Sequence, residues 1–139
     1  MLQFDMFLAI DYGKKRIGLA LGEVIPKGAG VIDGTASRQS IFEQIGKLCC
    51  ENEVDQIVVG LPFLGSGDEG AIAKDARKFG EALNRNISIP VFFEEEQYTS
   101  AEAERILNEN HIQYDKKKGQ VDEMAAVLIL EQYLNNKSN

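Results

Sequence analysis

The chain has 139 residues, with 22 acidic against 15 basic side chains and a formal net charge of -7. Its 44% hydrophobic and 27% charged content is ordinary for a globular protein and excludes a disordered or fibrous chain. This length predicts a single domain over residues 1–139. No run approaches 18 apolar residues and no basic leader precedes Asp5, so we expect neither a membrane span nor a signal peptide.

The few cysteines and the single histidine limit which disulfides and metal sites the chain can form. Cys49 and Cys50 are adjacent and cannot form a disulfide framework, which fits a reducing, cytoplasmic location. The single histidine, His111, and the lack of separated cysteine pairs exclude a typical structural zinc site. Any metal would therefore be a hard ion that carboxylates hold.

Short apolar runs and amphipathic segments follow one another along the chain. In chain order we predict strands at 4–10, 17–21 and 29–35, a helix that begins at Ser40, a strand at 56–59, a glycine-rich loop at 60–70, a helix at 71–84, a strand at 89–93, and helices at 99–110 and 121–134. The turn residues between the first three strands predict antiparallel hairpins, and strands joined through helices should be parallel with right-handed crossovers. The expected fold is an α/β domain with a mixed five-stranded sheet and helices on both faces.

Two helices carry specific local signals. Ser40 and Glu43 have the spacing of a capping box, which predicts the start of the first helix. In the second helix, a stripe at helical spacing predicts the buried face, and it consists of Ile72, Ala76, Phe79 and Leu83.

Acidic side chains stand where two strands end and where the last helix begins. Asp11 directly follows one apolar run, Glu94–Glu96 follow another, and Asp122 opens the last helix. The carboxyl ends of parallel strands meet at one edge of a sheet, so these acids should converge. Gathered carboxylates repel one another unless a cation is present, and Mg²⁺ suits such a site. Taken singly, each acid is more typical of an ordinary strand end or helix start than of a metal ligand; together they favour a metal site. The residues alone do not distinguish among the three glutamates.

Six of the 15 bases form two triplets beside these acids. Lys14, Lys15 and Arg16 follow Asp11 closely, and Lys116, Lys117 and Lys118 precede Asp122. Solvated turns are the usual role of such lysines, but a local basic site can bind phosphate on an acidic protein. Arg16 is the strongest candidate because its guanidinium can grip a phosphate with two bonds. The glycine-rich loop lacks the lysine and hydroxyl of a P-loop.

Four stretches resemble the YqgF/RuvX family. They are IDYGKKRIGLA at 10–20, VVGLP at 58–62, EEQYTSAEAE at 95–104 and VDEMAAVLIL at 121–130. The match runs nearly from end to end and in order. It implies an RNase H-like fold and a nuclease that matures the 5′ end of 16S rRNA or, alternatively, resolves Holliday junctions.

The resemblance also assigns residues. Its acid triad falls on Asp11, Glu96 and Asp122, which would be catalytic and would hold one or two Mg²⁺ or Mn²⁺ ions. The two basic triplets would then position the nucleic-acid backbone. The chain departs from the family at Gln97, where the family usually has an arginine.

The leading hypothesis is metal-dependent hydrolysis of phosphodiester bonds in precursor rRNA or branched DNA. A non-catalytic binding module is the first alternative, because Gln97 replaces an arginine and the net charge is -7. Junction resolution normally needs two sites related by a two-fold axis, so a monomer would favour rRNA processing and a weak dimer would keep resolution open. An actin-like phosphotransferase would share the Asp-x-Gly hairpin of Asp11 and Gly13, but one domain of this size lacks the second half that closes over ATP.

Overall fold

The computed structural model describes residues 4–62, 70–96, 99–110 and 119–138. Its elements are, in chain order, β1 (Phe7–Asp11), β2 (Arg16–Gly22), β3 (Lys27–Asp33), α1 (Arg38–Glu51), β4 (Gln56–Pro62), α2 (Ala71–Asn86), β5 (Val91–Glu96), α3 (Thr99–Glu109) and α4 (Gln120–Ser138). This order agrees with the one predicted from the sequence.

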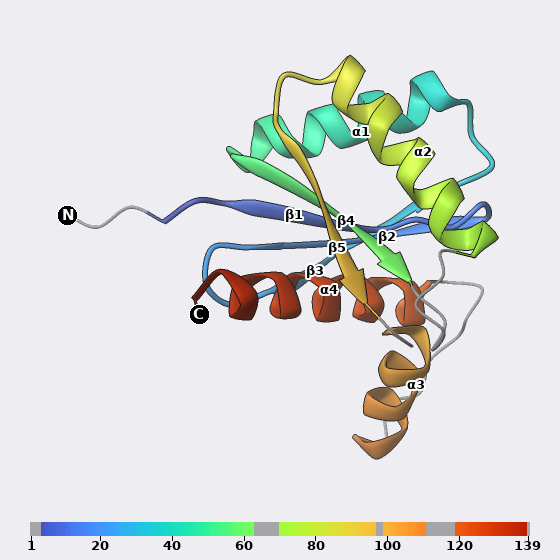
Figure 1. Cartoon of the computed structure of the whole chain (residues 1–139), viewed down its shortest axis with the longest axis vertical. Helices are drawn as coiled ribbons and strands as arrows, with labels where there is room; N and C mark the ends of the chain where they lie inside the picture. Colours follow the sequence, from blue (N-terminus) through green and yellow to red (C-terminus); the bar gives the residue numbers. More distant parts are fainter. Residues whose placement is uncertain (1–3, 63–69, 97–98, 111–118, 139) are drawn as a thin grey trace.

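The five strands form one mixed sheet in the order β3-β2-β1-β4-β5. β1, β2 and β3 pair antiparallel, whereas β4 pairs parallel with β1 and β5 pairs parallel with β4. Both predictions of strand direction are therefore confirmed. The parallel strands bring the carboxyl ends of β1, β4 and β5 to one edge of the sheet, where β2 begins (Figure 1).

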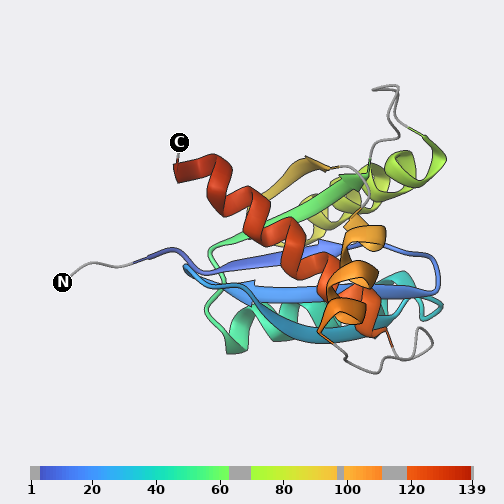
Figure 2. The same cartoon turned by 90° about the horizontal axis from the view of Figure 1, so that it is seen from below.

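Helices cover both faces of the sheet, as predicted. Along β1, Leu8 and Ile10 belong to the core under α1 and α2, whereas Phe7 and Ala9 belong to the core under α4. This alternation reflects the two-residue period of a strand, and burial on both faces explains why β1 is continuously apolar. Figures 1 and 2 show α4 lying across one face and α1 with α2 on the other.

α3 lies beside α4 rather than within the layer that covers the sheet (Figure 1). A separate cluster of buried side chains joins the two helices, and it consists of Ala103, Leu107, Val121 and Ala125. Because small side chains supply half of this cluster, the two helices can approach closely near the start of α4. Within the described ranges, no helix has both the length and the apolar character that crossing a bilayer requires.

Local details differ from the predictions at two helices. The N-cap of α1 is Ser37, whose hydroxyl accepts a hydrogen bond from the Ser40 N–H at 3.1 Å, so the predicted capping box was wrong by one turn. In α2, Ile72 is 67% exposed, whereas Ala73 is buried in line with Ala76 and Leu83. Ile72 is the second residue of α2, and the remaining three positions of the predicted stripe, Ala76, Phe79 and Leu83, are buried as predicted.

Strand boundaries also shift. β1 begins at Phe7 rather than at residue 4, and β4 continues to Pro62, so the first three residues of the predicted glycine-rich loop pair with β5. Pro90 stands just before β5, and its carbonyl accepts the Ile57 N–H at 2.9 Å. The rest of the predicted loop, residues 63–69, lies outside the described residues.

Candidate active site

Asp11 is the last residue of β1, at the carboxyl edge of the sheet. Strand alternation places it on the same face as Phe7 and Ala9, which pack under α4. Its cross-strand neighbour on β2 is Gly18. The carboxylate is thus directed toward the helix that begins beside it.

Asp122 lies in the first turn of α4, which is seated directly on β2. A Cβ atom on Gly18 would lie 2.0 Å from the backbone carbonyl oxygen of Asp122, closer than any real contact. Only glycine at position 18 therefore lets the helix approach the sheet this closely. The approach brings Asp122 to the strand residue that pairs with Asp11.

The two aspartates interact electrostatically. Burial, together with the nearby negative charge of Asp122, raises the pKa of Asp11 from 3.8 to about 7. A second carboxylate can act in this way only from close by, since Coulomb interactions weaken with distance and screening. The structure thus brings Asp11 and Asp122 together, 111 positions apart along the chain, as the sequence predicts.

Arg16 supplies the positive charge next to this pair. Its Nε donates a hydrogen bond to Oδ2 of Asp122 at 2.8 Å, and both side chains are partly buried, with exposed fractions of 33% and 22%. Arg16 and Gly18 stand two residues apart on β2, so they face α4 together. Arg16 is therefore the counter-ion of Asp122, a role that its predicted phosphate contact did not include.

Glu96 is the last residue of β5, and its Cα pairs with Pro62 of β4. Val59 of β4 pairs with both Ile10 and Phe93, which fixes the register across the three parallel strands. Asp11 therefore lies one residue beyond the row that Val59 forms with its two partners, and Glu96 lies three residues beyond that row. Both stand at the carboxyl edge of the sheet.

The other two glutamates of the triplet behave differently. Glu94 is only 9% exposed, and its Oε2 accepts hydrogen bonds from Gln132 and Asn136 of α4, each at 2.6 Å. Glu95 is exposed, and its backbone carbonyl accepts a further bond from Gln132. Glu94 therefore fastens α4 to β5.

The basic triplet after Asp11 lies in the turn between β1 and β2. Lys14 and Lys15 are exposed, and the Lys14 Nζ is 3.5 Å from Oδ2 of Asp75 on α2. The Gly34 N–H donates to the carbonyl of Lys15 at 2.9 Å, which ties the turn to the segment after β3. Gln97 and the second triplet, Lys116, Lys117 and Lys118, lie outside the described residues.

The donor set of this edge suits a hard divalent cation. Carboxylate oxygens are the ligands that Mg²⁺ and Mn²⁺ prefer, and a bound cation would offset the burial and the repulsion from Asp122 that together raise the pKa of Asp11. Among the side chains that the structure describes, no three histidine, cysteine, aspartate or glutamate groups converge. The described part of the site is thus the aspartate pair.

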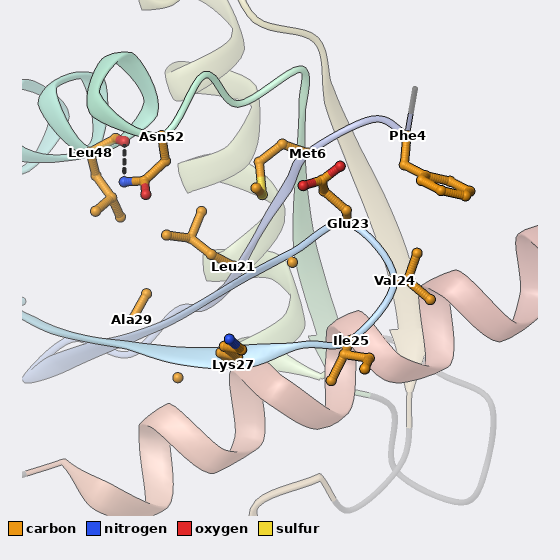
Figure 3. A pocket seen from close by; sticks show the side chains of 12 residues that line it. Phe4, Met6, Leu21, Glu23, Val24, Ile25, Lys27, Ala29, Leu48 and Asn52 are labelled. Atoms are coloured by element: carbon orange, nitrogen blue, oxygen red, sulfur yellow. Dashed lines mark hydrogen bonds between the residues drawn. The ribbon is translucent and has the colours of Figure 1, made fainter. Parts of the chain in front are cut away.

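A cavity of about 740 Å³ opens at the opposite end of the sheet, beside the turn between β2 and β3 (Figure 3). Its lining is mostly apolar and includes Phe4, Met6, Leu21, Val24, Ile25 and Leu48. Glu23 and Lys27 are its charged residues. One acid and one base in an apolar wall do not make a cluster of carboxylates that could hold a metal ion. The candidate active site is therefore the edge of the sheet that carries Asp11 and Asp122.

The fold and the acid pair define the class: an RNase H-like α/β domain with aspartates at the end of β1 and the start of α4. A similar fold occurs in Thermus thermophilus RuvC in complex with a Holliday junction substrate, with a TM-score of 0.58, 11% identity, and coverage of 97% of this chain and 96% of that chain. A second T. thermophilus RuvC structure gives a TM-score of 0.55 at 12% identity, covering 95% and 96%.

The family follows from the sequence comparisons. A family model described as "RuvX: Holliday junction resolvase" matches residues 5–136. A "Putative pre-16S rRNA nuclease" of Burkholderia vietnamiensis is 37% identical over 135 residues, covering 96% of this chain and 91% of that protein. A protein of the same name from Burkholderia multivorans is 36% identical over 134 residues, covering 95% and 90%. The chain belongs to the RuvX family.

Sequence reasoning missed the contacts that assemble the pair. Gly18 was noted only as part of a family motif, and the partner of Arg16 was not foreseen. The two-residue spacing of Arg16 and Gly18 was a usable signal, because it places a cation and a gap on one strand face.

Proposed function

We propose that this protein is a metal-dependent endonuclease that hydrolyses phosphodiester bonds in structured RNA, and that its reaction is the maturation of the 5′ end of 16S rRNA. The convergence of Asp11 and Asp122 at the carboxyl edge of the sheet carries the proposal. The names of the relatives support the substrate.

In this proposal Asp11, Glu96 and Asp122 hold one or two Mg²⁺ or Mn²⁺ ions. When bound, such ions activate a water molecule and stabilise the charge on the leaving oxygen. The water oxygen bonds to phosphorus while the bond from phosphorus to the 3′ oxygen breaks, so the downstream product keeps a 5′ phosphate. The aspartates orient the reacting groups through their carboxylate oxygens.

The basic residues act on the nucleic-acid backbone. Arg16 neutralises Asp122 in the metal-free protein, and its planar guanidinium suits a phosphate near the cleaved bond. Lys14 and Lys15, together with Lys116, Lys117 and Lys118, bind neighbouring phosphates, which positions the substrate without reading its sequence. The lack of an arginine at position 97 leaves Arg16 as the arginine of this site.

The proposal also covers the location and oligomeric state of the protein. Residues 1–139 act as one domain in the cytoplasm, where Cys49 and Cys50 stay reduced; both are free thiols in the structure. The protein works on RNA as a monomer or weak dimer. A second candidate is Holliday junction resolution, which the description of the family model favours.

The test is a cleavage assay with a precursor 16S rRNA fragment and a four-way DNA junction, each with Mg²⁺ and with Mn²⁺. Asp11→Asn and Asp122→Asn should each lower the rate by about a thousandfold or more, because the carboxylates act as a unit. Glu96→Gln should behave in the same way. Glu51→Gln, at an exposed position on α1, makes the matched change away from the site and should keep the wild-type rate.

The outcomes separate the candidates. Cleavage of the rRNA fragment alone supports maturation, and preferential cleavage of the junction supports resolution. Wild-type rates in Asp11→Asn would refute the proposed site. Binding of RNA by wild type without any cleavage under either metal would establish the non-catalytic alternative.

A further inference from the structure

The first turn of α4 lies across two neighbouring strands. Asp122 sits over β2, where Gly18 leaves room for its backbone, and Glu123 sits over β3. Consecutive helix residues point about 100° apart, so one rotation of the turn sets both side chains together. A contact that fixes Glu123 therefore also fixes the direction of Asp122.

Glu123 makes such a contact. Its Oε2 accepts a hydrogen bond from the backbone N–H of Gly30 at 2.6 Å, across 93 positions of sequence. Gly30 lies where the register between β2 and β3 shifts, between the pairs Gly18–Val31 and Ala20–Gly28, so it has no partner residue on β2 and its N–H bonds to the helix instead. A charged acceptor forms a strong bond with a backbone donor, and the donor here belongs to the sheet and cannot follow a moving helix.

The strand is shaped for this carboxylate. A Cβ atom on Gly28 would lie 2.5 Å from Cδ of Glu123, so only glycine leaves space for the side chain. Gly30 has φ +97, a conformation that residues with a side chain rarely adopt. Gly28 thus leaves room for the glutamate side chain, and the register shift at Gly30 supplies the N–H that this side chain accepts. An acid that merely answered the helix dipole would require neither.

We infer that Glu123 is a positioning residue, which holds the first turn of α4 on the backbone of β3 and so sets the carboxylate of Asp122 against Asp11 and Arg16. The inference rests on the proposed function for its catalytic meaning. The contact itself is a property of the metal-free protein and can be measured without activity.

The first readout is NMR of the metal-free protein, which follows the Nε–H signal of Arg16 and the amide signal of Gly30. Glu123→Ala should shift both signals and speed the solvent exchange of the Arg16 Nε–H about tenfold, because Asp122 is no longer held. Glu123→Gln keeps an oxygen that can accept the Gly30 N–H and should leave the Arg16 signal near its wild-type position. Glu131→Ala, at an exposed site later on α4, is the matched control.

The second readout is Mn²⁺ affinity by calorimetry, at a temperature where every variant is folded by circular dichroism. Loss of a residue that orients a ligand typically weakens metal binding by about 10–100-fold, which we expect for Glu123→Ala, with Glu123→Gln within about threefold of wild type. Gly28→Ala displaces the same side chain from the strand and should resemble Glu123→Ala.

These results separate two failures. An unchanged Arg16 signal in Glu123→Ala, or equal effects of the alanine and glutamine variants, would overturn the positioning role. Failure of the wild-type protein to bind Mn²⁺, with the NMR effects present, would overturn the proposed metal site and leave the positioning role standing.

Discussion

Gly18 lies between the two aspartates, and its lack of a side chain is what lets α4 reach the sheet. We predict that Gly18→Ala lowers the free energy of unfolding by about 2–3 kcal/mol, because its Cβ meets a rigid backbone carbonyl. The matched control is Gly46→Ala in α1, where a Cβ would meet nothing within 4 Å. That change should raise stability by about 0.5–1 kcal/mol, since alanine favours helix. Urea unfolding measures both, and effects of the same sign would contradict the prediction.

Asp11 predicts a pH dependence of stability. Its pKa is about 7 in the folded protein and 3.8 ordinarily, so the unfolded chain releases this proton first as the pH rises. Metal-free wild type should therefore lose stability between pH 4 and pH 7 and level off above. Asp11→Asn removes this loss and should be more stable than wild type by about 2–4 kcal/mol at pH 8. Thermal or urea unfolding in EDTA at several pH values tests it; parallel pH profiles would contradict it.

At the residue scale, the residue types at strand ends indicated which acids could meet at one edge of the sheet. Asp11 and Asp122 were predicted to converge, because each directly borders an apolar element. The partner of Arg16 and the acceptor of the Gly30 N–H were not predicted, because both depend on how α4 is rotated over the sheet. Sequence periodicity sets which face of a helix is buried, but it does not set the contacts of the polar residues at its end.

Among the described elements, α4 contacts the largest number of others, namely all five strands and α3. Its first turn carries Asp122, and its last turns reach β5 through the buried Glu94. The sequence pattern predicts this helix only as far as residue 134, whereas the helix continues to Ser138. The extra turn carries Asn136, one of the two donors to Glu94. Polar residues in the last turns concealed the continuation, because they interrupt the apolar pattern.

We predict that Gln132→Ala lowers the free energy of unfolding by about 1–3 kcal/mol. It removes a donor to the buried carboxylate of Glu94 and to the Glu95 carbonyl, and the remaining charge is then poorly solvated. Asn135→Ala changes an exposed residue of the same helix and should stay within about 0.5 kcal/mol of wild type. Equal urea midpoints for the two variants would show that the Glu94 contact does not stabilise α4.

Element order and strand direction were predictable because the strands are short apolar runs, of which the first three are separated by turns and the others by clear helices. The residues at which individual strands and helices begin and end were less predictable. β4 extends through the Gly60–Pro62 segment because this segment pairs with β5, a tertiary contact that outweighs the loop preference of glycine and proline. In the same way, Ser37 and Ser40 are both suitable N-caps, and only the path of the chain after β3 selects Ser37.

At the scale of the whole molecule, the two thiols report on unfolding. Cys49 is buried, and burial raises its pKa to about 11, whereas Cys50 is exposed. At pH 8 a thiol reagent should modify one cysteine rapidly and the second only as fast as the protein unfolds, because the thiolate is the reactive form. Cys50→Ser should abolish the rapid phase. Rapid modification of both cysteines in the folded protein would contradict the burial of Cys49.

Arg16 and Asp122 are separated by 106 positions, and α4 follows all five strands in the chain. During synthesis, the sheet therefore emerges from the ribosome before the helix that completes the site. A polypeptide that stalls before α4 has Asp11 but lacks its partner, and it leaves Phe7, Ala9 and Val58 uncovered on one face of the sheet. Such an unfinished product would be prone to aggregate, and under the proposed function it would also lack the carboxylate that completes the metal site.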